Sequence, residues 1–461
     1  MAENETKTVE PSKDARICII GGGPAGLSAA MYLEKKGYKN YVIYEKSDHV
    51  GGKCHSPVYK GKRFEEGAIM GVPSYYAVHD IELFAGVSHD DGPKLNRDFK
   101  NLKGEVIHPF DPKKFWRLPH LLKLKKQMKR LGELLETKYK GYDVNGHRGV
   151  AQGKYIGDDC TPDRKHIEGE NPNLKDLSMP FKDFCEMNKV PLVQEVWSGP
   201  FTAFGYGFFD EIPAAYALKY LDFQTCMNFV KCNLWTWKDG TQSIYEALNS
   251  KLIHQATLNS NITKVVRTDT NVTVTVNGKD EVFDKLIVTA PLQYFPEYAD
   301  ATAEEKELFS KIDFERYDVL ALTMKEGQYP VDSYYILANM VPERLGHLMI
   351  YYRRWKDEPD QAITTYALRN HKGSKEVPYE ECKKTVLEDI VTYKNEYDKV
   401  FDEHSWYYFP HVFSEDYAAG WYDKVEGMQG QRCTYYAGEI MSFGDMDETC
   451  EYSRELVGRF F

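Results

Sequence analysis

The feature that most constrains the fold is a glycine-rich turn between an apolar strand and a helix of small residues. Residues 17–20 read Ile-Cys-Ile-Ile, and residues 21–26 read Gly-Gly-Gly-Pro-Ala-Gly. We expect Gly21 to allow the tight turn, Gly23 to let backbone amides approach a pyrophosphate, and Gly26 to let the helix pack against the strand. The amino end of the helix then faces the phosphate charge.

A second strand supports this prediction. Residues 41–44 read Tyr-Val-Ile-Tyr and end at Glu45. An acidic residue about 20 positions beyond the glycine turn accepts hydrogen bonds from a ribose diol. Strand, glycine turn, helix, second strand and acid therefore occur in the order that predicts a dinucleotide site.

A further glycine pair narrows the choice of nucleotide. Val50-Gly51-Gly52-Lys53 follows Glu45 closely and offers backbone approach to a ligand. A nicotinamide nucleotide does not need this second loop, whereas FAD continues past its pyrophosphate toward the flavin. The alternative is a simple turn, since Gly-Gly is a common turn dipeptide.

The chain shows no second turn of this kind after a strand. We therefore expect hydride to pass between an organic substrate and flavin N5 without a nicotinamide step. The sequence also has no HExxH, no GxSxG and no histidine cluster at metal-ligand spacing. It assigns no catalytic side chain and predicts no metal ligand.

Composition limits the partners and the compartment. The net charge of −11 makes nucleic acid an unexpected partner, because phosphate backbones require basic surface. Nine cysteines without a CxxC pair argue against a disulfide framework or a zinc site. Residues 1–13 are polar and predict a disordered leader without a secretory signal. We expect a cytoplasmic protein, and the sequence carries no signal for an oligomeric state.

The order of the segments predicts an α/β fold with two domains. A Rossmann-like FAD-binding domain is assembled from discontinuous segments, and an α+β substrate-binding domain is inserted between them. The expected FAD-binding segments are 14–76, 230–291 and 404–461, and the expected substrate-binding segments are 77–229 and 292–403. Strands at 262–266, 272–276 and 286–290 and a last helix at 445–461 belong to the first domain.

Two segments of the inserted region stand out. Residues 121–131 form a basic amphipathic pattern, which predicts either an ordinary surface helix or peripheral contact with a membrane. Residues 141–176 are polar and rich in glycine, asparagine and proline, so we expect a surface excursion there.

Several strings together resemble the flavin amine oxidase and phytoene desaturase superfamily. They are the glycine turn, Glu45, Gly51-Gly52-Lys53, Val288-Thr289-Ala290-Pro291 and Tyr436-Ala437-Gly438-Glu439. The resemblance implies that Gly438 and Glu439 contact the phosphate and ribityl region, and that Val265 meets the adenine through its backbone. The predicted cofactor-binding residues are Gly21, Gly23, Pro24, Ala25, Gly26, Glu45, Lys46, Gly51, Gly52, Lys53, Val265, Gly438 and Glu439.

Within that superfamily the chain is similar to bacterial polyenoic fatty acid isomerases. Residues 48–57, 67–75, 200–207, 235–237 and 421–430 carry this likeness, which extends over nearly the whole chain from Asp14. It implies an FAD-dependent isomerase that shifts a double bond of a free polyunsaturated fatty acid such as linoleate and forms a conjugated diene.

The same resemblance implies a substrate site. It places Arg97 and Phe229 at the mouth of a tunnel, and an aromatic lining that includes Phe201, Phe204 and Tyr206. An arginine suits a carboxylate because its donors form a fork. The alternatives are a surface ion pair of Arg97 with a neighbour such as Asp98 and a plain aromatic core.

Two other functions remain open at this point. One is an oxidase of the amine oxidase type, in which oxygen reoxidises the flavin and hydrogen peroxide is released. The other is a lipid-binding flavoprotein without turnover, since a fold and a cofactor do not prove catalysis.

Overall fold

A computed structural model describes residues 10–93, 95–111, 113, 117–139, 171–221, 223–325, 333–356 and 362–461. Most of the predicted leader, at residues 1–9, and most of the polar excursion, at 140–170, lie outside the described residues.

The glycine turn belongs to a parallel sheet whose described strands follow the order β16-β10-β1-β2. All four residues of β1 are buried, because a parallel sheet is covered on both faces and needs a continuous apolar run. The strands are β1 (Ile17–Ile20), β2 (Tyr41–Tyr44), β10 (Lys285–Val288) and β16 (Thr434–Tyr436).

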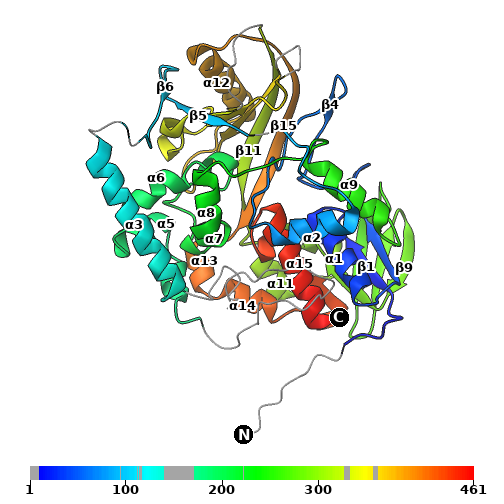
Figure 1. Ribbon diagram of the computed structural model, residues 1–461. Coiled ribbons are helices and arrows are strands. Elements are labelled where there is room, and N and C mark those ends of the chain that lie inside the picture. Colours follow the sequence, from blue (N-terminus) through cyan, green and yellow to red (C-terminus); the bar gives the residue numbers. More distant parts are fainter. Residues whose placement is uncertain are drawn as a thin grey trace.

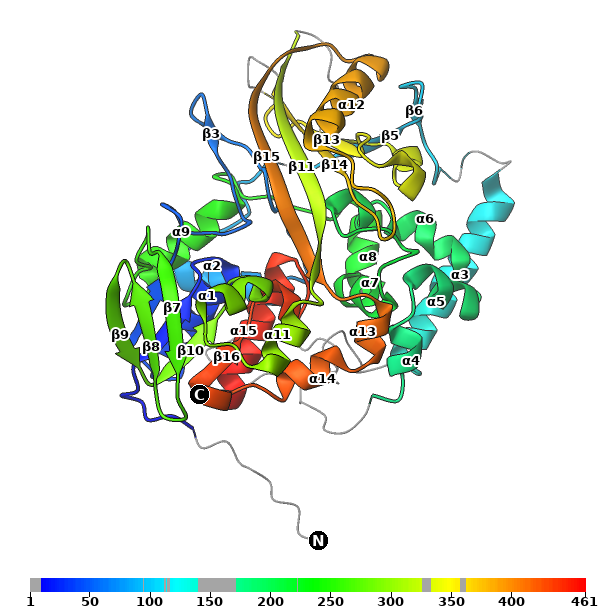
Figure 2. The ribbon, with the colours of Figure 1, turned by 180° about the vertical axis from the view of Figure 1, so that it is seen from behind.

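Helices cover one face of this sheet and an antiparallel sheet covers the other (Figures 1 and 2). The helices are α1 (Pro24–Lys35), α2 (Tyr76–Ala85), α9 (Thr241–Lys251) and α15 (Met446–Phe460). The antiparallel strands are β7 (Ile262–Arg267), β8 (Val272–Val276) and β9 (Lys279–Phe283). Phe283 packs edge-on against Tyr44 of β2, at 6.3 Å between ring centroids, and so joins the two layers.

A second, larger sheet stands beside this unit, with its described strands in the order β15-β11-β14-β13-β12-β5-β6. β5 joins β12 in parallel, so Arg97 lies beside Ser333. The strands are β5 (Arg97–Lys100), β6 (Val106–Ile107), β11 (Asp313–Met324), β12 (Ser333–Tyr335), β13 (Ile350–Tyr352), β14 (Ile363–Leu368) and β15 (Tyr397–His411). A short hairpin of β3 (Val58–Tyr59) and β4 (Lys62–Arg63) lies near β15 (Figure 2).

One helix, α12, lies against the large sheet, and a group that includes α3, α5, α6, α7 and α8 lies below it (Figure 2). The helix predicted at 121–131 is observed as part of α3. The remaining helices are α3 (Leu118–Glu136), α4 (Leu174–Leu177), α5 (Phe181–Met187), α6 (Gln194–Trp197), α7 (Ala214–Tyr220), α8 (Phe223–Val230), α10 (Phe295–Tyr298), α11 (Ala303–Phe309), α12 (Tyr379–Thr392), α13 (Ser414–Ala418) and α14 (Trp421–Glu426).

This architecture confirms the predicted fold class, a Rossmann-like unit with an inserted α+β region. The last helix also forms as predicted, because Asp445 caps it by accepting hydrogen bonds from the amides of Asp447 and Glu448, at 2.7 and 2.8 Å. Among the described residues, no helix combines the length and the apolar character needed to cross a bilayer.

Two elements lie differently from the expected domain limits. β15 runs through the limit expected at 403/404 and pairs with β11 from Tyr397 to His411, so it belongs to the large sheet throughout. α2, expected in the substrate-binding domain, packs against the cofactor unit: the Val78 amide donates to Asp447, and Asp80 pairs with Lys35 at 2.8 Å.

Candidate functional site

The carboxyl ends of the four parallel strands bring the predicted cofactor residues to one edge of the sheet. β1 leads into Gly21, β2 into Glu45, β10 into Thr289, and β16 into Ala437 and Gly438. Ligands of open α/β sheets bind outside this edge. The chain therefore assembles the site from four segments that are far apart in the sequence.

The first glycine turn has no room for a side chain at Gly21 or at Gly26. Gly21 has φ +113°, and a Cβ there would collide with Thr289 Oγ1. A Cβ on Gly26 would collide with the carbonyl oxygen of Gly21, so this glycine lets α1 approach the turn closely. Gly23 precedes α1 and makes no side-chain cap bond, and Pro24 opens the helix. The first amides of α1 are thus left for a ligand.

Glu45 lies directly against this turn. Its carboxylate accepts hydrogen bonds from the amides of Gly22, at 2.6 Å, and Ser47, at 2.7 Å. These bonds fix the orientation of the side chain and leave lone pairs for the hydroxyls of a ribose. Lys46 follows with an exposed side chain, and Ala25 is buried in α1.

The second glycine pair packs onto the first turn. The Gly51 amide donates to the Gly22 carbonyl at 3.0 Å, and a Cβ on Gly52 would lie 3.2 Å from Gly23 Cα. Beyond the pair, Lys53 Nζ forms an ion pair with Glu439 Oε2 at 2.6 Å. Backbone surface, helix amides, an acid and a cation therefore follow one another along the edge, and this arrangement fits FAD.

Val265 is placed less directly. It is 1% exposed, and its carbonyl accepts a hydrogen bond from Asp300 N at 3.1 Å. The segment that contacts Glu45 comes earlier, since Ser260 N donates to the Glu45 carbonyl at 2.8 Å. Along the chain, Ile262 is therefore closer than Val265 to the contact between Ser260 and Glu45. The role of Val265 at the adenine stays a prediction.

Sequence reasoning missed a buried ion pair that joins the two units. Arg354, which follows β13, lies 3.0 Å from Glu65, and the two side chains are 1% and 0% exposed. Glu65 also accepts bonds from Ser56 Oγ, at 2.6 Å, and from Thr241 N and Oγ1, both at 3.0 Å. Burial raises the pKa of the Glu65 carboxyl, and Arg354 and these donors oppose that effect.

Arg97 lies in the wall of a pocket at the edge of the large sheet. Its Nη2 donates to the carbonyls of Phe229, at 2.5 Å, and Val230, at 3.2 Å, whereas Asp98 lies near His108. Apart from Arg97, the wall of this pocket is largely apolar. Its lining consists of Ile69, Met70, Leu95, Asn96, Arg97, Phe204, Cys232, Leu234, Ser333, Tyr335, Ile350 and Tyr352.

An unbroken series of aromatic contacts leads from this pocket to the cofactor edge. At the pocket end, the Arg97 guanidinium lies 5.9 Å from the centroid of the Tyr335 ring. The distances between the centroids of successive rings are 6.3 Å from Tyr335 to Phe204, 5.8 Å to Phe229, 6.0 Å to Tyr220, 5.0 Å to Tyr206 and 5.6 Å to Tyr408. At the cofactor end, Lys53 Nζ lies 5.3 Å from the centroid of the Tyr408 ring. We call these six rings the aromatic path.

The predicted aromatic residues hold different places on this path. Phe204 is half-buried and lines the pocket, and the buried Phe229 touches its ring. Tyr206 lies at the deep end, and Phe201 packs on it from the core at 5.5 Å. Burial raises the pKa of Tyr206, so its hydroxyl stays neutral. The deep end of the path therefore carries no charge of its own.

The matching family is described as flavin-containing amine oxidoreductases, and its sequence model covers residues 24–444. The polyenoic fatty acid isomerase of Ptilota filicina is 25% identical over 356 residues, which are 71% of this chain and 68% of that protein.

Solved structures extend this likeness. A fatty acid isomerase from P. acnes, described as producing CLA, is 50% identical, with a TM-score of 0.89 over 98% of this chain and 100% of that chain. A putrescine oxidase bound to putrescine shares the fold alone, at 14% identity and a TM-score of 0.67 over 97% of this chain and 99% of that chain. These findings confirm the predicted resemblance to fatty acid isomerases and the predicted cofactor, FAD. The chain belongs to the flavin-containing amine oxidoreductase family.

Proposed function

We propose that the protein is an FAD-dependent isomerase of a free polyunsaturated fatty acid such as linoleate, with a conjugated diene as its product. The observation that carries this proposal is the aromatic path, which joins an arginine at one end to the cofactor edge at the other. A fatty acid has the matching shape, a carboxylate head on a long apolar chain. The fatty acid isomerase from P. acnes, which is 50% identical to this chain, supports the same assignment.

The residues of this chain hold and orient the substrate in our proposal. When bound, FAD supplies a hydride acceptor and donor at N5, so that a hydride taken from a doubly allylic carbon can return to another carbon. Arg97 binds the carboxylate through donors that its two carbonyl partners leave over. The aromatic path contacts the acyl chain and excludes water. No side chain needs to transfer a proton, and catalysis depends on position.

An anaerobic incubation of the FAD-loaded protein with linoleate tests this function. We expect diene absorbance to rise without oxygen and without hydrogen peroxide, and deuterium at the doubly allylic carbon to remain in the product. Hydrogen taken up from solvent would contradict the hydride route. Peroxide formation in air would indicate an oxidase instead, and binding of linoleate without any product would indicate a lipid-binding flavoprotein.

We also propose that α3 binds the protein to a membrane surface, from which the protein takes up free fatty acids as its substrate. Leu118 and Leu122 are 46% and 58% exposed on this helix, and Lys123, Lys125 and Lys126 are exposed beside them. Apolar and basic side chains together suit an anionic bilayer. We expect co-sedimentation with phosphatidylglycerol vesicles and loss of it in the Lys125→Glu, Lys126→Glu variant. Equal sedimentation of the two proteins would indicate an ordinary surface helix.

A further inference from the structure

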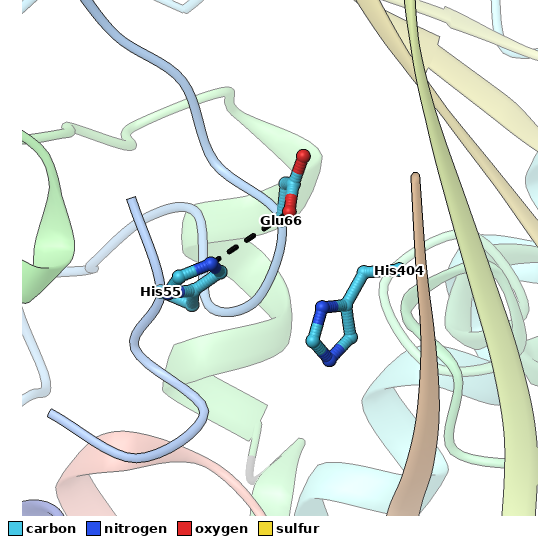
Figure 3. Close-up of side chains that lie close together, drawn as sticks. All are labelled: His55, Glu66 and His404. Carbon is cyan, nitrogen blue, oxygen red and sulfur yellow. Dashed lines mark ion pairs between the residues drawn. The ribbon is translucent and has the colours of Figure 1, made fainter. Parts of the chain in front are cut away.

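Three potential metal ligands, two from one segment and one from a distant strand, face one another between the two units. They are His55 and Glu66, which flank the hairpin of β3 and β4, and His404 of β15 (Figure 3). One ligand atom from each residue lies within 4.8 Å of the other two, and His55 Nε2 is 3.8 Å from Glu66 Oε2. The sequence alone predicted no metal ligand, because these residues show no local spacing.

Backbone bonds fix the frame of this cluster. Glu66 N donates to the carbonyl of His55 at 3.0 Å, so these two residues are held side by side. Trp406 Nε1 donates to the carbonyl of Glu66 at 2.6 Å, which attaches β15 to the same segment. The His404 ring packs on Trp406 at 3.7 Å between centroids. The backbone is thus positioned independently of the three ligand atoms.

The Glu66 carboxyl is buried beside a second carboxyl group, that of Asp402. Glu66 is 2% exposed, and its Oε1 has no hydrogen-bond partner among the described residues. A buried polar atom without a partner is costly, so a cation at this point would stabilise the carboxylate. The ring nitrogens of His55 and His404 face the same space, and a neutral imidazole has one nitrogen with a lone pair for a cation.

We propose that His55, Glu66 and His404 bind a divalent transition-metal ion, for which Zn²⁺ is the best match. Two imidazoles and one carboxylate are a donor set that zinc accepts, with a fourth position left for water. Ca²⁺ and Mg²⁺ prefer sets made of oxygen donors. Zinc ligands at about 2.1 Å lie roughly 3.4 Å apart in a tetrahedron, so ligand atoms that lie up to 4.8 Å apart need to close by up to about 1.4 Å. The bound ion joins the hairpin segment to β15.

Zinc titration of the full-length, FAD-loaded protein tests this site. We expect one Zn²⁺ per chain by isothermal titration calorimetry and by elemental analysis after dialysis. The variants His404→Ala and Glu66→Gln should each weaken binding by about 100-fold or more, since even groups that only support a ligand change affinity by about 10- to 100-fold. The control variant is His120→Ala, because His120 is an exposed histidine that pairs with Glu195 on α6 at 2.8 Å.

Copper(II) provides a measurement that does not depend on activity. In the electron paramagnetic resonance spectrum of the Cu²⁺-loaded protein we expect coupling to two imidazole nitrogens, and to one fewer in His404→Gln. The flavin absorbance of each variant shows whether that variant has folded around FAD. If one of the variants lacks flavin, His55→Gln is measured in its place. Absence of saturable zinc binding, or equal affinity in the wild type and in the variants, would overturn the proposal.

Discussion

Arg97 is the residue whose replacement tests the substrate assignment most directly. A guanidinium has five N–H donors, and in this structure Nη2 is committed to the carbonyls of Phe229 and Val230. The guanidinium also interacts with the Tyr335 hydroxyl, and the donors that remain can bind a carboxylate. A hydrogen bond to a charged group contributes about 1.5–3 kcal/mol, so Arg97→Ala should lower kcat/KM for linoleate by about 10- to 150-fold. The kcat/KM of Arg97→Lys should fall between those of the wild type and Arg97→Ala, because lysine keeps the positive charge but lacks the two-pronged donor geometry of arginine.

The assay is the initial rate of conjugated-diene formation under anaerobic conditions, measured over a range of linoleate concentrations. Methyl linoleate provides the matched control, because it has the same chain without the negative charge. We expect the wild-type preference for the acid over the ester to disappear in Arg97→Ala, mainly through KM.

The variant also loses the two bonds to the end of α8, at about 1 kcal/mol each. Flavin content and Tm should therefore be measured alongside the rates. An equal loss for acid and ester would show that Arg97 acts on the structure of the pocket. An unchanged KM for linoleate would remove Arg97 from the substrate site.

Three further predictions concern the second glycine pair, the Arg354–Glu65 ion pair and the buried Glu315. Gly52→Val should lose FAD, because a Cβ there would lie 3.2 Å from Gly23 of the first glycine turn, and the loss is measured as a lower flavin-to-protein absorbance ratio. The control variant Gly132→Ala, in α3, should retain FAD. Equal flavin content in the two variants would contradict the close approach of the two turns. Glu65→Gln should lower stability in urea by about 3–5 kcal/mol, because Arg354 would keep a buried charge, and a change below about 1 kcal/mol would argue against the pair. Burial and a neighbouring carboxylate raise the pKa of Glu315 well above its ordinary value, so the native state holds this proton more tightly than the unfolded chain, and stability falls as pH rises above about 4.3. Glu315→Gln imitates the protonated form, and its Tm advantage should grow from about pH 5 to about pH 8; a constant difference would refute this.

The cofactor edge could be predicted because its signals are local. The glycine turn, α1, β2 and Glu45 follow one another along the chain, and the structure gives Gly21 and Gly26 the steric roles that the sequence pattern predicts. The last helix could be predicted in the same way, since Asp445 provides its N-terminal cap. Gly438 depends on long-range pairing, and only the resemblance to a family pointed to it.

The large sheet and its limits could not be predicted in this way. β5 pairs with β12 across more than two hundred residues, and no turn or spacing encodes that contact. The limit expected at 403/404 lies within β15, because the alternation of a long strand gives no sign of which sheet it joins. Arg354 with Glu65, and His55 with His404, are likewise brought together only by the completed fold.

β15 restricts how this protein can evolve. Residues two apart on a strand share a face, and His404, Trp406 and Tyr408 occupy three successive positions of one face. They serve the histidine cluster, the bond to Glu66 and the deep end of the aromatic path, respectively. A single residue inserted or deleted between His404 and Tyr408 would turn the side chains on one side of the change to the opposite face, unless a bulge absorbed it. The pairing of β15 with β11 already contains such irregularities elsewhere, but a further one here would separate the three contacts from one another.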